Sequence, residues 1–308
     1  MPLRGFIAAF VLGVFASQAR AADPIGYAEA FDTLYSVDLV THAATEIGRA
    51  TPLESPTRYA NITGLTFNPG GVLYAISDAG QTKTLLTIDR NTGLATPVGT
   101  LNLGTSQQLD LSLAFTCDGV LWMAAGNGDF WRVDPLQATA THLGNLGVAI
   151  TGLAVGKGKL YAAGGQGNNN LYVIDPAAVT ATPAGSYGSS VYITTTSLAF
   201  DKSGRIWAVL DYVPPQSDSQ PVKQWSDLAQ LAANGALSNL GSITPATSAS
   251  TADLEYIGLK GLAIPSGICA VTAALGTTPL LSWPAMAMLI GAFALLGGTT
   301  LRRRHQTP

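Results

Sequence analysis

The chain has 308 residues, only 11% of which are charged, and its formal net charge at pH 7 is -3. It has no basic patch, which excludes the electrostatic footprint of a nucleic-acid-binding protein. Its 34 glycines, set among Ser, Thr and Asn, predict turn-rich β structure in one large or two small domains.

The N-terminus has the three parts of a secretory signal peptide. Arg4 supplies the positive charge, residues 6–15 form an apolar stretch, and the Ala-Arg-Ala sequence at 19–21 fits a cleavage site. The alternative, an N-terminal membrane anchor, needs a longer apolar run. We therefore predict a signal peptide at residues 1–21, cleavage after Ala21, and export of the remainder.

The mature chain repeats one sequence motif, which we call the phrase. Its clearest copy extends from Ile150 to Gly185: Ile-Thr-Gly-Leu-Ala-Val, a glycine turn, Lys-Leu-Tyr-Ala-Ala, a polar glycine loop, Leu-Tyr-Val-Ile-Asp and Ala-Thr-Pro-Ala-Gly. Each piece is a short apolar run closed by a turn, which is typical of β-strands. Other full copies begin at Ile62, Leu111 and Thr196, and the last of these carries a Pro-rich insertion at 214–221.

The spacing of the copies predicts the architecture. The aspartates that end the third run of each copy are spaced by 51, 45, 41 and 52 residues; they are Asp38, Asp89, Asp134, Asp175 and Asp227. A period of 40 to 50 residues with four short strands per unit is the signature of a β-propeller. Radial repetition hides the sheet edges that a single unit would expose.

The two ends of the repeat region predict how the ring closes. Residues 30–38 and 45–48 match only the third and fourth strands of the phrase, and residues 253–264 match only its first strand. Together they make one composite blade, so the sequence predicts an all-β, five-bladed propeller over residues 22–264. An open β-solenoid does not account for complementary half-copies, and six or seven blades would need units where only loops are seen.

A second hydrophobic segment lies near the C-terminus. Residues 280–301 carry no charged side chain and would be about 33 Å long as a helix, which spans a bilayer core. Arg302, Arg303 and Arg304 follow directly, so the positive-inside rule places the tail 302–308 in the cytoplasm and the body across the membrane. A buried core helix is the weaker alternative, because the run is long and ends in arginines. Residues 265–279 form the linker.

This tail resembles a known sorting signal. Residues 278–283 read Thr-Pro-Leu-Leu-Ser-Trp, and the apolar segment and three arginines follow. The order is similar to the IPTL-CTERM protein-sorting tail of Gram-negative bacteria, an exosortase/PEP-CTERM-like domain. The matching positions are Pro279, Ser282, Trp283 and the arginines, whereas Leu280 replaces the motif's Thr and no spacer separates Ser282 from Trp283. The resemblance implies a bacterial envelope protein whose partners are the membrane and a sorting or processing enzyme.

The two cysteines both fall on the exported side. An oxidising compartment permits a disulfide between Cys117 and Cys269, although two separate thiols are an equal alternative. Zinc binding lacks ligands, because only these two cysteines and three scattered histidines are present.

Candidate binding residues lie in the loops predicted to share one face of the propeller. Loops on a rigid scaffold are the usual place for ligand contacts. The candidates are Asp78, Asp129, Asn168 and Asp211 in the loops, with Asp110, Asp253 and Glu255 at the central mouth.

Three interpretations of these residues are open. Converging oxygen ligands would suit a hard cation such as Ca²⁺. No other cofactor is indicated by the sequence. Two of the carboxylates could hydrolyse a glycoside. The simplest interpretation is that Asp and Asn form turns. No nucleophile elbow, phosphate-binding loop or metalloprotease motif occurs, so no residue receives a catalytic role.

Two recurrent features have structural explanations. The aspartates that end the third run precede turns and are expected to accept backbone amide hydrogen bonds. Aromatic residues inside the strands are expected to form the core between blades. Three tyrosines in loops, Tyr187, Tyr192 and Tyr212, are candidates for a sugar-stacking platform, although packing in the core or at the rim is favoured.

The sequence therefore predicts an exported, membrane-anchored or surface-sorted propeller that binds a ligand or serves as a scaffold in the bacterial envelope. The competing hypothesis is an envelope hydrolase that acts on a carbohydrate or lactone through the loop face, with or without Ca²⁺. The identity of the ligand does not follow from the sequence.

Overall fold

The computed structural model of the protein describes residues 25–52, 55, 57–79, 83–103, 110–188, 192–212, 226–246 and 258–265. The predicted signal peptide, the insertion at 214–221, the membrane helix at 280–301, the tail 302–308, and the sorting-motif residues Pro279, Ser282, Trp283 and Arg302 to Arg304 lie outside these residues, as do Asp253, Glu255 and Cys269. Among the described residues, no helix is long and apolar enough to cross a membrane.

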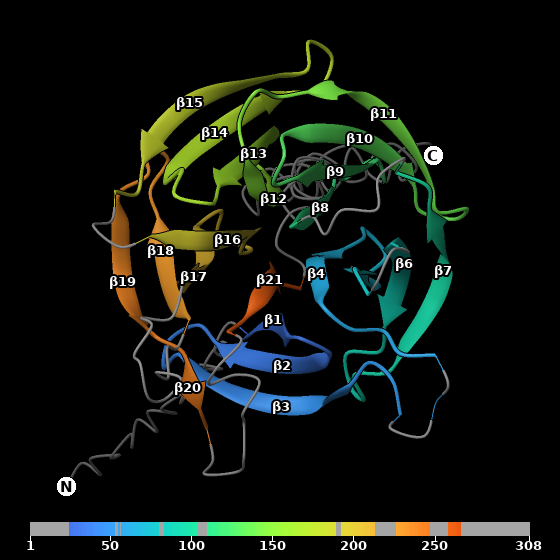
Figure 1. Cartoon of the computed structure of the whole chain (residues 1–308). Coiled ribbons are helices and arrows are strands. Elements are labelled where there is room, and N and C mark those ends of the chain that lie inside the picture. Colours follow the sequence, from blue (N-terminus) through green and yellow to red (C-terminus); the bar gives the residue numbers. More distant parts are fainter. Residues whose placement is uncertain are drawn as a thin grey trace, which may run out of the picture.

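The described strands form five sheets arranged as blades around one axis (Figure 1). Four blades are continuous in sequence and each runs from an inner to an outer strand: β4 (Ile62–Phe67), β5 (Leu73–Ser77), β6 (Lys83–Ile88) and β7 (Ala95–Leu101); β8 (Leu111–Phe115), β9 (Leu121–Ala125), β10 (Asp129–Asp134) and β11 (Thr139–Asn145); β12 (Ile150–Gly156), β13 (Lys159–Gly164), β14 (Asn170–Asp175) and β15 (Thr180–Ser186); β16 (Ile193–Phe200), β17 (Ile206–Tyr212), β18 (Asp227–Leu231) and β19 (Leu237–Ser242). The predicted all-β, five-bladed propeller is confirmed.

The fifth blade is composite, as predicted, but its division differs from the prediction. Its order is β20 (Thr244–Pro245), β3 (Ala43–Arg49), β2 (Thr33–Asp38), β1 (Ile25–Ala30) and β21 (Lys260–Ala263). The N-terminal part therefore supplies the second, third and fourth strands, not only the last two. β21 supplies the inner strand and pairs antiparallel with β1, with Tyr27 opposite Ala263 and Glu29 opposite Lys260.

Burial within each blade follows distance from the axis. Every residue of the inner strand β12 is buried, whereas the outer strand β15 of the same blade is exposed or half-buried throughout. An inner strand has neighbours on both faces and therefore reads as a nearly continuous apolar run. This is why the opening run of each repeat is the most hydrophobic.

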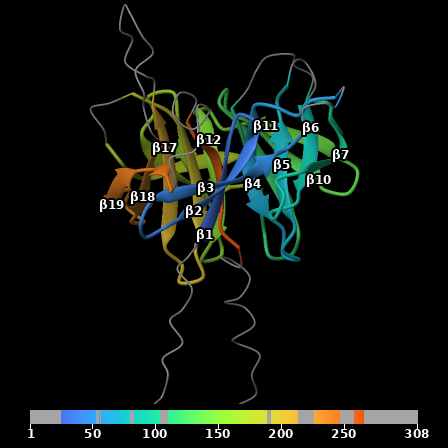
Figure 2. The same ribbon diagram turned by 90° about the horizontal axis from the view of Figure 1, so that it is seen from below.

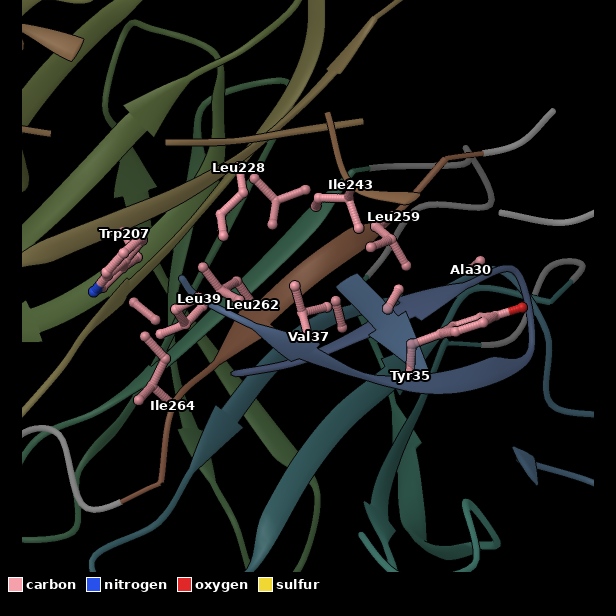
Figure 3. Packing of buried hydrophobic residues seen from close by; sticks show 14 residues of the cluster. Ala30, Tyr35, Val37, Leu39, Trp207, Leu228, Ile243, Leu259, Leu262 and Ile264 are labelled. Atoms are coloured by element: carbon pink, nitrogen blue, oxygen red, sulfur yellow. The ribbon is translucent and has the colours of Figure 1, made fainter. Parts of the chain in front are cut away.

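Five hydrophobic clusters hold the ring together, one at each junction between neighbouring blades. Figure 3 shows the cluster at which the composite blade meets the blade β16–β19: Val37, Leu39 and Leu262 face Trp207 and Leu228. Because every junction has its own core, the ring is closed. The predicted core role of the strand aromatics is confirmed: Tyr35, Tyr74, Trp131, Tyr161, Tyr172 and Trp207 are buried, and Trp122 is half-buried against one cluster.

The glycine that closes each repeat has a packing role. In the outer strands, Gly48, Gly144 and Gly185 each abut the turn between the third and fourth strands of the next blade. A Cβ on Gly185 would lie 1.8 Å from the carbonyl oxygen of Asn234, which no rearrangement of a side chain can relieve. The outer edges of neighbouring blades can approach this closely only where no Cβ intervenes.

The recurrent aspartates have the predicted structural role. Asp38, Asp134 and Asp175 each accept two backbone amide hydrogen bonds from the residues two and three positions later, and Asp89 accepts one. The fifth assignment was wrong, because Asp227 begins β18 instead of ending it. Its carboxylate accepts hydrogen bonds from Tyr212 and Ser242 instead. The insertion before β18 lengthened the repeat and displaced the apparent match.

The inner strands define two faces of the ring. We call the face on which they begin the mouth face and the other the opposite face; the side view in Figure 2 shows β21 crossing the ring between them. Since β21 begins at Lys260 on the mouth face and β1 is antiparallel to it, β1 starts and β21 ends at the opposite face. The chain thus enters and leaves the described ring through one face.

Candidate functional site

The predicted loops do share the mouth face. Each lies between the second and third strands of a blade: Asp78 follows β5, residues 126–128 join β9 to β10, residues 165–169 join β13 to β14, and Asp211 is near the end of β17. Antiparallel order brings the ends of all second strands to the face on which the inner strands begin. Asp110 stands at the same face, directly before β8.

At the centre of this face is a narrow axial cavity of about 20 Å³, to which all five inner strands contribute. This is about the space that one water molecule needs. Near its entrance each blade supplies one polar side chain, and we call this group the axial mouth: Thr63, Asp110, Thr151, Thr195 and Lys260.

Two hydroxyl groups of the axial mouth have no partner among the described residues. The side chains of Thr63 and Thr195 are 3% and 4% exposed, yet neither Oγ1 has a hydrogen bond. Thr151, in contrast, accepts a hydrogen bond from the backbone amide of Thr196 at 2.8 Å. Because buried polar groups are nearly always hydrogen-bonded, a water molecule of the size that the cavity admits would supply a partner for these two hydroxyls.

Charged groups meet at one side of the axial mouth. The Lys260 Nζ donates a hydrogen bond to the Asp110 Oδ1 at 3.2 Å, and both side chains are about one-quarter exposed. Asp211 lies nearby but is only 7% exposed, and its Oδ1 accepts a hydrogen bond from the Ser226 Oγ at 3.1 Å. Burial raises the pKa of Asp211 to about 7, and the nearby Lys260 ammonium and the Ser226 hydrogen bond only partly oppose this rise.

The structure does not bring the other described candidates into this group. Asp78 forms a fully buried ion pair with Lys83, 2.5 Å between Oδ1 and Nζ. Asn168 accepts hydrogen bonds from Asn170 and Tyr172 within its own blade.

Asp129 likewise lies apart from the axis. Its carboxylate contacts the His142 ring at 3.3 Å and accepts hydrogen bonds from Asn127 and Asn145. Burial raises the pKa of Asp129, but these hydrogen bonds outweigh burial and hold it below its usual value.

The three loop tyrosines do not form a platform. Tyr187 is buried and donates its hydroxyl hydrogen to the Gly164 carbonyl at 2.7 Å. Tyr212 is half-buried and donates to Asp227 at 3.0 Å. Tyr192 alone is exposed, at 52%. The packing interpretation therefore holds for Tyr187 and Tyr212.

Sequence reasoning missed the threonines and Lys260. A signal was present, because Thr63 and Thr151 occupy the same position of the phrase Ile-Thr-Gly-Leu, directly before the glycine. A polar residue repeated inside an otherwise apolar inner strand indicates a lining of the axis. Lys260 stands at that position in the last half-copy.

The cation hypothesis finds no cluster to support it in the part of the chain that the structure describes, where no three His, Cys, Asp or Glu side chains are placed to hold a metal ion. Asp253 and Glu255, on which that hypothesis also rests, are outside this part. Cys117 is disulfide-bonded. Its predicted partner, Cys269, is not described, so the pairing stays a prediction.

Because of the raised pKa of Asp211, we expect the protein to become less stable as the pH rises. The pKa of Asp211 is about 7 in the folded protein and near 3.8 when unfolded, so the folded state retains the proton longer. The free energy of unfolding should therefore fall as the pH rises from about 4 to about 7, on the order of 3 kcal/mol for this group. Asp211→Asn should remove that part of the decline and be more stable than the parent at pH 8. Urea unfolding at pH 5 and pH 8 measures it, and Asp129→Asn, whose pKa is shifted the other way, should not gain stability at pH 8.

Comparison with solved structures finds proteins of low similarity. A structural genomics protein of unknown function from Bacteroides thetaiotaomicron is 16% identical, with a TM-score of 0.45, over 61% of this chain and 54% of that one. The chain therefore spans about half the length of that protein. The nidogen/laminin complex is 12% identical with a TM-score of 0.48, over 80% and 99%. A putative gluconolactonase is 15% identical with a TM-score of 0.42, over 73% and 79%. Similarities of this size say nothing about function.

No curated protein matches the chain. One family model does, over residues 33–209, which is more than half of the chain and includes strands of all five blades. The model is described as a repeat of unknown function, and its residues coincide with the repeated β phrase. The chain belongs to this family of repeats of unknown function, DUF6923.

Proposed function

We propose that the protein is a binding module whose ligand places a polar group in the axial mouth. The observation that carries this proposal is the pair of buried hydroxyls of Thr63 and Thr195, which line the axial cavity without a hydrogen-bond partner among the described residues. Lys260 and Asp110 at the entrance add a donor and an acceptor.

The chemistry of the axial mouth favours a neutral, hydroxyl-rich ligand. One ammonium group faces one carboxylate at 3.2 Å, so the entrance has no strong excess of either charge. Hydroxyl groups both donate and accept, and a carbohydrate hydroxyl can bond to Thr, Asp and Lys alike. Since the cavity holds about 20 Å³, only one such group would enter, and the rest of the ligand would lie on the mouth face.

Carbohydrate binding by the mature chain tests the proposal. We expect binding to an envelope glycan on an array, and a Kd about 10- to 100-fold weaker by calorimetry for Asp110→Asn or Lys260→Met, because each removes a hydrogen bond to a charged group. Asp129→Asn is the matched control on the same face and should bind like the parent. Equal affinities for all four proteins would show that the ligand does not use the axial mouth.

The alternative function is hydrolysis of a carbohydrate or lactone through the loop face. One observation favours it: Asp211 lies within electrostatic range of Asp110, and burial raises the pKa of Asp211 to about 7, so this carboxyl group could act as a general acid. Turnover of such a substrate that is lost in Asp211→Asn would establish this function. Binding without turnover would leave the first proposal. Addition and chelation of Ca²⁺ in the same assay test a calcium requirement.

We further propose that the protein is exported and held at the bacterial envelope by its C-terminal segment, with the mouth face directed away from the membrane. Support comes from the predicted signal peptide and apolar segment, and from the strand order, in which β1 begins and β21 ends at the opposite face. A ring held by its C-terminal segment would then present the axial mouth outward.

Cysteine labelling tests export and orientation together. In spheroplasts, a bulky maleimide should modify Asn127→Cys, on the mouth face, faster than Asn91→Cys, in the β6–β7 turn of the opposite face. The parent chain provides the background. Labelling of neither cysteine would argue against export, and equal rates would argue against the orientation. The intact mass of the mature protein shows whether a sorting enzyme has removed the residues after the Pro279 motif.

A further inference from the structure

The opposite face carries two hollows that adjoin each other. The first, of about 480 Å³, surrounds the axis where the inner strands end and includes Phe115 and Pro265 in its lining. The second, of about 1100 Å³, lies beside it over the blades β8–β11, β12–β15 and β16–β19. Val155 and Phe200 line both, so the two hollows meet at these apolar side chains.

We call the second hollow the junction pocket. Its lining includes Cys117, Trp122, Val155, Leu160, Val173 and Phe200. Trp122 and Val173 are only half-buried, although neighbouring residues of their strands are buried. An apolar hollow of this size on a solvent-exposed face indicates a contact with another apolar segment.

We infer that the junction pocket binds residues 266–279 of this same chain, which leave the ring at Pro265, and that a disulfide between Cys117 and Cys269 fastens them there. Pro265 already stands in the lining of the adjoining hollow, and Cys117, which lines the junction pocket, is disulfide-bonded. The sequence contains one other cysteine, Cys269.

The chain length permits this arrangement. Cys269 is four positions after Pro265, a stretch that can span at most about 14 Å. Cys117 is only two residues beyond Phe115, which shares a hollow with Pro265. Leu275 is six positions after Cys269, so the chain can then extend up to about 20 Å further along the pocket.

The chemistry of the segment matches the pocket. Residues 266–279 carry no charge and supply Ile268, Val271 and Leu275 as apolar side chains. Forming the disulfide takes two protons and two electrons from the thiols, and a disulfide oxidant of the exported compartment accepts them as it becomes a dithiol.

The docked segment would secure the ring closure. β21, which completes the composite blade, has only four residues, and it is followed directly by this segment. Fastening the chain to the blade β8–β11 restrains β21 at its far end. This inference does not depend on what the axial mouth binds.

Peptide mapping of the full-length protein in detergent, without reductant, is the first test. We expect one linked pair of peptides, containing Cys117 and Cys269, within a single molecule. Cys117 joined to a second copy of the chain would overturn the inference.

Photo-crosslinking tests the pocket itself. With p-benzoylphenylalanine at position 275, the oxidised full-length chain should crosslink within one molecule to peptides that contain Trp122, Val173 or Phe200. The matched control is position 136, where Leu136 is 82% exposed on the same face and should give none of these products. Cys269→Ser should lower the yield several-fold. Products of twice the mass, which would be crosslinks between two copies of the chain, or no crosslink to the three peptides, would contradict the proposal.

Discussion

Asp78→Ala should lower the free energy of unfolding by about 3–5 kcal/mol, because it leaves the Lys83 ammonium buried without its carboxylate. The two side chains form an ion pair of 2.5 Å and are at most 1% exposed. An isolated charge in such a place must either keep its desolvation cost or lose its proton. Urea unfolding of the full chain at pH 7 measures the loss.

The reciprocal and double variants make this prediction specific. Lys83→Met leaves the Asp78 carboxylate buried without its ammonium partner and should lower the free energy of unfolding by a similar amount. The double variant Asp78→Leu with Lys83→Met removes both charges and should be close to the parent in stability or above it, as well-packed apolar replacements of buried pairs are. If the double variant were as unstable as Asp78→Ala, packing and not charge would be the cause.

A chain that ends at residue 258 should fail to form the closed ring, whereas a chain that ends at residue 265 should fold. The difference is β21 with its flanking residues, which bury Leu259, Leu262 and Ile264 at the junction in Figure 3. Burial of each such side chain contributes about 1.5–3 kcal/mol, so the loss is about 5–9 kcal/mol. That is as large as the whole stability of many domains.

The two chains are matched because both begin at residue 22 and both lack Cys269 and the apolar segment. Circular dichroism, urea unfolding and size-exclusion chromatography distinguish them. We also expect the shorter chain to associate, since removal of β21 leaves the edge of β1 unpaired. Identical unfolding midpoints would mean that the ring does not depend on its closing strand.

The repeat and its composite closure were predictable because they are written in local patterns. Strand alternation, glycine turns and capping aspartates recur at a fixed period, and each acts within a few residues. The structure confirmed the blades, the composite closure and the turn role of Asp38, Asp89, Asp134 and Asp175. Asp227 was misassigned because the insertion changed the period.

β1 was missed because its sequence is a poor strand signal. Residues 25–30 read Ile-Gly-Tyr-Ala-Glu-Ala, with two alanines, a glycine and a glutamate, all of which are uncommon in strands. Glu29 is nevertheless fully buried, and burial, with a smaller effect of Asp32, raises its pKa well above the usual value. The neighbouring strands β2 and β21 determine this element, not its own propensity.

The sequence by itself determined the blade, the number of blades and the face on which the polar loops lie. Only the tertiary structure decided which polar side chains meet at the axis. Lys260 and Asp110 are 150 residues apart and belong to different blades, and Thr63 and Thr195 come from two others. Such contacts arise when the ring closes and sets five inner strands side by side, and no local pattern encodes which of their side chains will share a cavity. The closing glycines follow the same rule, since the Cβ that they lack would strike the next blade and not their own.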